Sequence, residues 1–146
     1  MSDTMNQTTI DYRQHFPQAF EHLQQVHVHI QASGLNRELG HLIMLRASQI
    51  NGCGFCVKMH TREAREDGMT NHRLDHLAAW RQVADYTQPE RAALAWLEAL
   101  TILDPKTDFQ TLRLALLEHF PEQQIASLTV LCAMINLWNR IQISNH

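Results

Sequence analysis

The sequence predicts an all-α protein, and three observations support that fold class. Apolar residues recur at helical spacing along most of the chain, and no segment alternates as a half-buried strand would. Five glycines and four prolines are too few for a turn-rich β fold. A chain of 146 residues that is 45% hydrophobic and 18% charged can bury one core. We therefore expect one domain over residues 1–146, with about six to seven helices.

The N-terminal part of the chain predicts a frayed end followed by two helices. The first dozen residues are polar, and we expect them to be frayed. Pro17 suits the first turn of a helix that Gly34 ends. Asn36 is a capping residue for the next helix, and the Asn51–Gly52 pair breaks that helix. The apolar face of this second helix consists of Leu39, Leu42, Ile43 and Ala47.

Two further helices are predicted in the middle of the chain. The third runs from about Cys53 to Asp67 and is stopped by Gly68. Thr70 can cap a short fourth helix that includes Trp80.

The C-terminal half predicts three more helices. The segment Thr87–Glu90 has the pattern of a capping box, with a proline in the first turn, and Asp104–Pro105 ends the helix behind it. Another helix extends from Phe109 to Phe120. The last begins after Pro121 and covers Glu122 to about Ile141.

Charge and apolar patterning exclude several function classes. The formal net charge of −3 gives no basic excess for a phosphate backbone, so we do not expect nucleic acid as a partner. Because the N-terminal residues include no basic region followed by an apolar run, we expect no secretory signal. The longest apolar stretch, Ile125 to Trp138, is too short to span a bilayer. We expect a cytoplasmic protein without a membrane partner. In that reducing compartment, a close cysteine pair is more often catalytic or metal-binding than structural.

The chemistry of the sequence is concentrated in Cys53, Cys56 and His60. Their spacing of i, i+3 and i+7 places them on one stripe of a helix. Because the pair falls in the first turn, free N–H groups and the helix dipole stabilise a thiolate there. An imidazole one turn later can accept or hold a proton. These three groups suit dithiol redox chemistry.

Two other interpretations of the motif remain open from the residues alone. The cysteines can be buried small hydrophobes without reactivity. Alternatively, C-x-x-C-x-x-x-H supplies three zinc ligands, although no second paired motif offers a fourth. The third cysteine, Cys132, lies in an apolar segment and is interpreted as an inert buried thiol.

The region around the motif resembles a known family. The matching segments are LIMLRASQINGCGFCVKMHTREAREDG (Leu42 to Gly68), LAAWR (Leu77 to Arg81), PERAALAWLEALT (Pro89 to Thr101) and INLWNR (Ile135 to Arg140). They resemble the carboxymuconolactone decarboxylase/AhpD-like superfamily, in its alkylhydroperoxidase branch. The similarity covers most of the chain after about residue 35.

The resemblance implies an all-α fold that assembles as a homotrimer or homohexamer and reduces peroxides in antioxidant defence. It implies that Cys56 attacks the peroxide, that Cys53 resolves the sulfenic acid into a disulfide, and that His60 belongs to a proton relay. It further implies an external dithiol or thioredoxin-type reductant, with no organic cofactor or metal. The decarboxylase branch lacks the cysteine pair, which argues against lactone decarboxylation here.

The sequence departs from the family pattern at two positions. Members usually carry a glutamate twelve residues before the first cysteine, where this chain has His41. Some branches have a histidine directly before the second cysteine, where this chain has Phe55. His41 can replace the relay glutamate, with Glu38 orienting it and Ser48 in helical register with it. It can also be a fourth metal ligand or an ordinary half-buried histidine.

Several other residues are interpreted as structural. His22, His27 and His29 lack the spacing of paired helical ligands and are expected on the surface or at the core edge. Asn136 and Asn139 are expected to make structural or subunit contacts. Two function hypotheses therefore stand beside peroxide reduction. One is a non-peroxidatic thiol–disulfide oxidoreductase or redox-sensing oligomer, and the other is a zinc-stabilised binding module.

Overall fold

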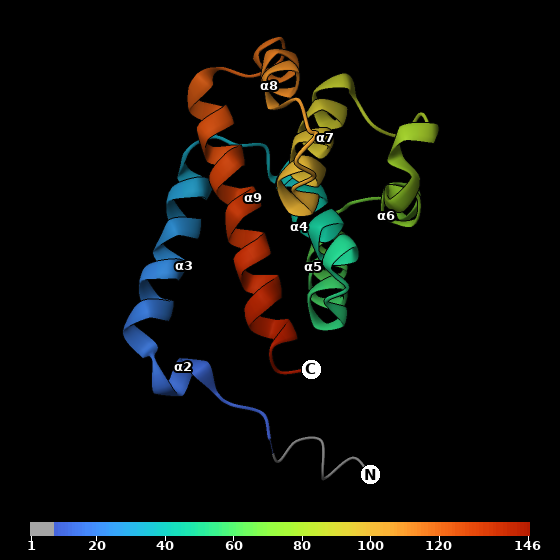
Figure 1. Cartoon of the computed structure of the whole chain (residues 1–146). Helices are drawn as coiled ribbons and strands as arrows, with labels where there is room; N and C mark the ends of the chain where they lie inside the picture. Colours follow the sequence, from blue (N-terminus) through green and yellow to red (C-terminus); the bar gives the residue numbers. More distant parts are fainter. Residues whose placement is uncertain (1–7) are drawn as a thin grey trace.

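The computed structural model describes residues 8–146, and over that range the regular structure is entirely helical, as predicted. The elements are α2 (Tyr12–His15), α3 (Pro17–Ala32), α4 (Arg37–Asn51), α5 (Gly54–Glu66), α6 (Asn71–Asp75), the 3-10 helix η1 (Leu77–Gln82), α7 (Gln88–Ile102), α8 (Phe109–Leu117) and α9 (Glu122–Ile143). The long α9 runs beside α3 through most of the length of the molecule, and α8 lies near the start of α9 (Figure 1).

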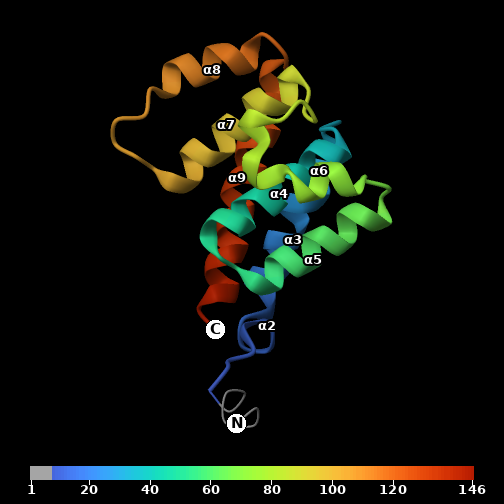
Figure 2. The same ribbon diagram turned by 90° about the vertical axis from the view of Figure 1, so that its right-hand side faces the viewer.

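Helix α4 lies at the centre of the packing. Its contacts with α9, α5 and α7 are more extensive than those between any other two helices of the described residues. Figure 2 shows α4 among these helices. Its apolar face contributes Leu42 and Ile43, which are fully buried, to a core that extends into α7 and α9. Because burying each such side chain stabilises the fold by about 1.5–3 kcal/mol, this face fixes the position of α4. The end of α4 is therefore held firmly in the core, and so is the turn that connects α4 to α5.

Capping hydrogen bonds are present at two of the predicted helix starts. The side chain of Asn36 accepts the N–H of Leu39 at 3.0 Å, and Thr87 and Glu90 form both bonds of the capping box. Pro17 lies in the first turn of α3. Thr70 occupies the N-cap position of α6, but its side chain makes no capping hydrogen bond, so that detail of the prediction is wrong.

The region predicted as one short fourth helix is divided. Helix α6 ends at Asp75, and η1 follows with a non-helical residue inside it, Ala79 (φ −113°, ψ 29°). The division turns Leu77 and Trp80 into the core, where both are buried. Burial of these two side chains thus takes precedence over a continuous helix.

The N-terminal segment is more ordered than the sequence suggests. Residues 1–7 lie outside the described range, and for residues 10–12 the expectation of fraying is wrong. Ile10 N–H donates to Asn145 Oδ1 at 3.0 Å, and Asn145 Nδ2 donates back to Ile10 O at 2.8 Å. The hydroxyls of Tyr12 and Ser144 are 2.8 Å apart. These bonds attach the start of the chain to the end of α9.

Across residues 8–146, no helix combines the length and apolar character that crossing a membrane requires.

Candidate redox site

The turn between α4 and α5 places the cysteine pair at a helix N-terminus. Helix α4 ends at Asn51, and Gly52 adopts the left-handed conformation (φ 69°) that favours glycine. The chain then returns so that Cys53 is the N-cap of α5, and its N–H donates to Ser48 O at 3.0 Å. The Asn–Gly break in the sequence thus corresponds to a tight turn that delivers both cysteines to the first turn of α5.

Cys53 and Cys56 form a disulfide with a Cα–Cα distance of 5.3 Å. The sulfur of Cys53 also accepts the N–H of Cys56 at 3.3 Å. Neither residue is openly exposed, since Cys53 is 0% and Cys56 3% accessible. A cavity of about 310 Å³ between α2, the start of α5 and the end of α9 has Cys56 in its wall, whereas Cys53 does not line it. Of the two cysteines, Cys56 is therefore the one beside this cavity.

Hydrogen bonds among asparagine side chains connect the end of α4 to α9. Asn51 Nδ2 donates to the side-chain oxygens of both Asn136 and Asn139 at 2.9 Å. Asn139 in turn donates to the hydroxyl of Ser48 at 3.0 Å. Arg140 donates to the side-chain oxygen of Asn136 at 3.0 Å. The last helix thus fixes the end of α4, which is the structural role expected for Asn136 and Asn139.

His60 lies one turn beyond Cys56 on α5 and is buried. Its Nδ1 is 3.4 Å from Glu63 Oε2, within ion-pair distance, but it makes no hydrogen bond. Burial lowers the pKa of His60, because removing the imidazolium from water outweighs the attraction of Glu63. His60 is therefore a neutral imidazole near pH 7, the form that can accept a proton from a thiol.

His41 is buried beside Asp67, to which it is connected by a short hydrogen bond. The distance from His41 Nε2 to Asp67 Oδ2 is 2.5 Å, and Arg37 Nε also donates to Oδ2 at 2.6 Å. The bonds from His41 and Arg37 hold the pKa of the Asp67 carboxyl below its ordinary value. Since an ionised carboxylate only accepts, Nε2 of His41 carries a proton. Nδ1 of His41 is buried and has no hydrogen-bond partner.

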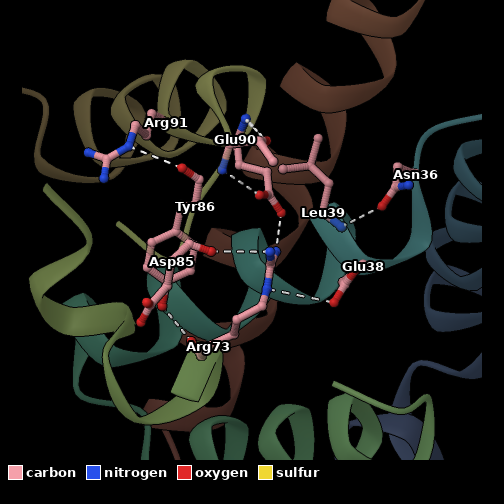
Figure 3. A network of polar contacts seen from close by, with 9 residues as sticks. Asn36, Glu38, Leu39, Arg73, Asp85, Tyr86, Glu90 and Arg91 are labelled. Carbon is pink, nitrogen blue, oxygen red and sulfur yellow. Dashed lines mark hydrogen bonds and ion pairs between the residues drawn. The ribbon is translucent and has the colours of Figure 1, made fainter. Parts of the chain in front are cut away.

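The expected partners of His41 lie elsewhere. Glu38 points toward Arg73, with Oε1 3.7 Å from Nε, and Figure 3 shows Arg73 between Glu38 and Glu90. The prediction that Glu38 orients His41 is therefore wrong. Ser48 donates to Met44 O at 2.7 Å and accepts from Asn139, so it does not share a hydrogen bond with His41. Asp67, next to the glycine that stops α5, takes the role assigned to Glu38.

A second cavity lies beside His41. It has a volume of about 490 Å³, and His41, Glu63 and Asp67 line it together with His27 of α3. His27 is half-buried, and its Nε2 accepts the indole N–H of Trp138 at 2.7 Å. Burial lowers the pKa of His27. Polar side chains from α3, α4 and the end of α5 thus line this cavity together.

The remaining predicted candidates are not part of this arrangement. His22 and His29 are exposed on α3. Cys132 is fully buried in α9, where burial raises the pKa of its thiol, as expected of an unreactive cysteine. Among residues 8–146, no three His, Cys, Asp or Glu side chains are grouped as a metal site would require. Sequence reasoning missed Asp67, because its contact with His41 joins residues 26 positions apart.

A helical protein with a C-x-x-C disulfide at a helix start and two buried histidines on adjacent helices has the architecture of a dithiol protein of the AhpD type. Residues 14–99 match the model of the carboxymuconolactone decarboxylase family. The chain belongs to this family, within the AhpD-like superfamily that the sequence resembles.

Relatives and solved structures agree with this assignment. The chain is 35% identical to the uncharacterised protein YdfG of Bacillus subtilis, over 92% of each chain. It is 33% identical to the uncharacterised protein YnjA of Escherichia coli, over 66% of this chain and 52% of that protein. A crystal structure from Agrobacterium tumefaciens superposes with a TM-score of 0.86 at 39% identity, over 94% of each chain. That protein, of unknown function, is described as a candidate antioxidant defence protein AhpD.

A more distant structure shows the fold alone. The alkylhydroperoxidase AhpD core of an uncharacterised peroxidase-related protein from Ralstonia eutropha superposes with a TM-score of 0.78 at 22% identity. The match covers 91% of this chain and 71% of that protein.

Proposed function

We propose that the protein is a thiol-dependent peroxidase that reduces peroxides through a Cys53–Cys56 dithiol–disulfide cycle. The observation that carries the proposal is the Cys53–Cys56 disulfide at the start of α5, with Cys56 in the wall of a cavity and the neutral imidazole of His60 one turn away. A thiolate, a resolving thiol and a base are the groups that this chemistry needs. The family relation and the described role of the Agrobacterium protein support the same activity.

The oxidative half of the cycle begins at Cys56. His60 accepts the thiol proton, and the thiolate attacks the outer oxygen of the peroxide R–O–O–H. The O–O bond breaks, sulfur is oxidised to a sulfenic acid, and the leaving alkoxide takes the proton back to become R–OH. Cys53 then attacks the sulfenic sulfur, releasing water and forming the disulfide. The Cys56 N–H directed at the Cys53 sulfur favours the thiolate form of Cys53 for this step.

His41 and Asp67 are proposed to complete the proton relay. Asp67 fixes the ring of His41 so that Nδ1 is free to exchange a proton inside the protein. His60 Nδ1 is the other buried ring atom without a hydrogen-bond partner. The polar cavity beside His41 and Glu63 supplies water to this pair. The His41–Asp67 pair thereby takes the place of the family glutamate.

An external dithiol or thioredoxin-type protein is proposed to restore the pair by disulfide exchange. No cofactor or metal is needed for these steps, and a reducing cytoplasm would supply the electrons. Homotrimers or homohexamers are proposed as the working state, supported by exposed apolar side chains remote from the cysteines, including Leu103, Leu114 and Leu117.

The test is steady-state peroxide consumption with a dithiol reductant. We expect Cys56→Ser to abolish turnover. Pre-reduced Cys53→Ser, freed of the dithiol, should consume about one equivalent of peroxide and then stop, with a sulfenic acid trapped at Cys56. Cys132→Ser is the matched control and should retain activity. Turnover that persists in Cys56→Ser would contradict the assignment.

A second candidate is a thiol–disulfide oxidoreductase that does not act on peroxides. The observation in its favour is the hydrogen bond from the Cys56 N–H to Cys53, which stabilises the first cysteine as a thiolate for disulfide exchange. Efficient exchange with a protein disulfide, without peroxide consumption, would establish this alternative.

A further inference from the structure

The cavity at Cys56 is larger than hydrogen peroxide needs. Its volume of about 310 Å³ compares with about 30 Å³ for one water molecule in the liquid and falls at the lower end of small-molecule sites. Its apolar lining includes side chains from three helices, namely Phe20, Phe55, Met59, Trp138 and Ile141. Such walls favour a peroxide with an organic body, because an apolar group gains about 25 cal/mol per Å² on leaving water.

Residues 10–13 form another part of the cavity wall, and hydrogen bonds attach this segment to the end of the chain. Ile10 exchanges two hydrogen bonds with Asn145, and Tyr12 bonds to Ser144. The side chain of Asp11 accepts the N–H of Gln14 at 3.1 Å and thereby caps α2. Helix α2 therefore holds a fixed position across the start of α5 and the end of α9.

Arg13 of α2 is held at the cavity by two aromatic rings. Its guanidinium carbon is 5.1 Å from the ring centre of Phe20 and 5.6 Å from that of Trp138. Within residues 8–146, no carboxylate lies within ion-pair distance of Arg13; Asp11 shares the cavity wall but caps the helix instead. A guanidinium on aromatic faces keeps its N–H groups available for a planar carboxylate.

We propose that this cavity, lined by Arg13, Phe20, Phe55, Met59 and Trp138, is the substrate subsite of the proposed peroxidase, and that it selects hydroperoxides of apolar carboxylic acids. The hydrocarbon body lies against the rings, the carboxylate pairs with Arg13, and the peroxide group reaches Cys56. Reduction breaks the O–O bond, transfers the outer oxygen to the sulfur of Cys56, and releases the corresponding hydroxy acid after protonation. The disulfide that follows is reduced by the external dithiol. The inference rests on the proposed function.

The test compares a medium-chain fatty-acid hydroperoxide with its methyl ester and with hydrogen peroxide. We expect the wild-type protein to prefer the acid, and Arg13→Met to lower kcat/KM for the acid by about three- to tenfold. The same variant should change kcat/KM for the ester and for hydrogen peroxide by less than about twofold. Arg13→Lys should restore part of the preference.

The matched control is Arg113→Met on α8, which removes the same charge from an exposed site that does not line this cavity. Equal losses for acid and ester, or no loss for either, would overturn the subsite. Absence of turnover with every peroxide would instead overturn the proposed function.

A binding measurement separates the two failures independently of turnover. The unreactive medium-chain fatty acid should bind the oxidised protein and change the fluorescence of Trp138, and Arg13→Met should weaken that binding by a similar factor. Binding that is unaffected by Arg13→Met would contradict the carboxylate contact even in an active enzyme.

Discussion

Two buried polar regions of this protein differ in how completely their atoms are paired. Glu98 of α7 accepts from Arg46 at 3.0 Å and from the Trp80 indole at 2.9 Å, and it also pairs with Arg81. At the redox site, by contrast, His41 Nδ1 and His60 Nδ1 are buried without a hydrogen-bond partner. Buried polar groups with all their hydrogen bonds stabilise a scaffold. A buried polar atom without a partner costs stability, and a role in a reaction is one reason for a protein to keep it.

The difference separates structural from chemical residues within one family motif. Trp80, Arg81 and Glu98 belong to the matching segments as fully as His60 does. Their contacts show that they connect η1 and α7 to α4, the helix that supports the cysteine turn. A residue can therefore be typical of the family because it stabilises the fold, without taking part in the reaction.

Apart from the cysteine substitutions, the largest effect on activity is expected from His60→Asn. Loss of the base should lower kcat/KM by about a hundredfold or more, with little loss of stability. In the wild-type protein, kcat/KM should fall as pH decreases through the pKa of His60, which burial places below 6.5, and the variant should lose this limb. The exposed His119→Asn is the control. An unchanged pH profile in His60→Asn would mean that His60 takes no part in proton transfer.

Substitution of Glu98 is expected to lower stability rather than activity. Glu98→Gln should lower the free energy of unfolding by about 2–3 kcal/mol, since Arg46 and Arg81 lose a buried partner, while the folded variant stays active. Although burial opposes it, hydrogen bonds from Arg81, Trp80 and Arg46 lower the pKa of Glu98. This stabilisation is present above the ordinary glutamate pKa and is lost as pH falls through the lowered value. Urea unfolding at several pH values should therefore show the two proteins converging in acid, whereas exposed Glu21→Gln has no effect.

A smaller effect is expected from Asp67→Asn. The amide keeps the size of the carboxylate but not its charge, so it holds the His41 ring less firmly, and kcat/KM should fall by about three- to tenfold. Asp75→Asn is the matched control, since Asp75 is exposed on α6. If Asp67→Asn and Asp75→Asn behave alike at every pH, the His41–Asp67 pair is structural.

The sequence predicts those features that depend on local interactions. Helix periods, the caps at Asn36 and Thr87, and the one-turn spacing of Cys56 and His60 are determined within a few residues. The fold class and the family therefore follow from the sequence alone.

Contacts between distant residues could not be predicted in this way. Asp67 rather than Glu38 meets His41, because the packing of α5 on α4 decides which carboxylate is near. The bonds between Ile10 and Asn145 join residues 135 positions apart and create the wall that carries Arg13. The spacing of apolar and polar residues along the chain does not predict such long-range contacts.

The most direct measurement is peptide mass spectrometry of the pre-reduced protein after one equivalent of peroxide. We predict the loss of two hydrogens, mapped to a Cys53–Cys56 bond, with Cys132 still reduced and the peroxide consumed. Thiols that remain unchanged at Cys53 and Cys56 while the protein is folded would contradict the central proposal.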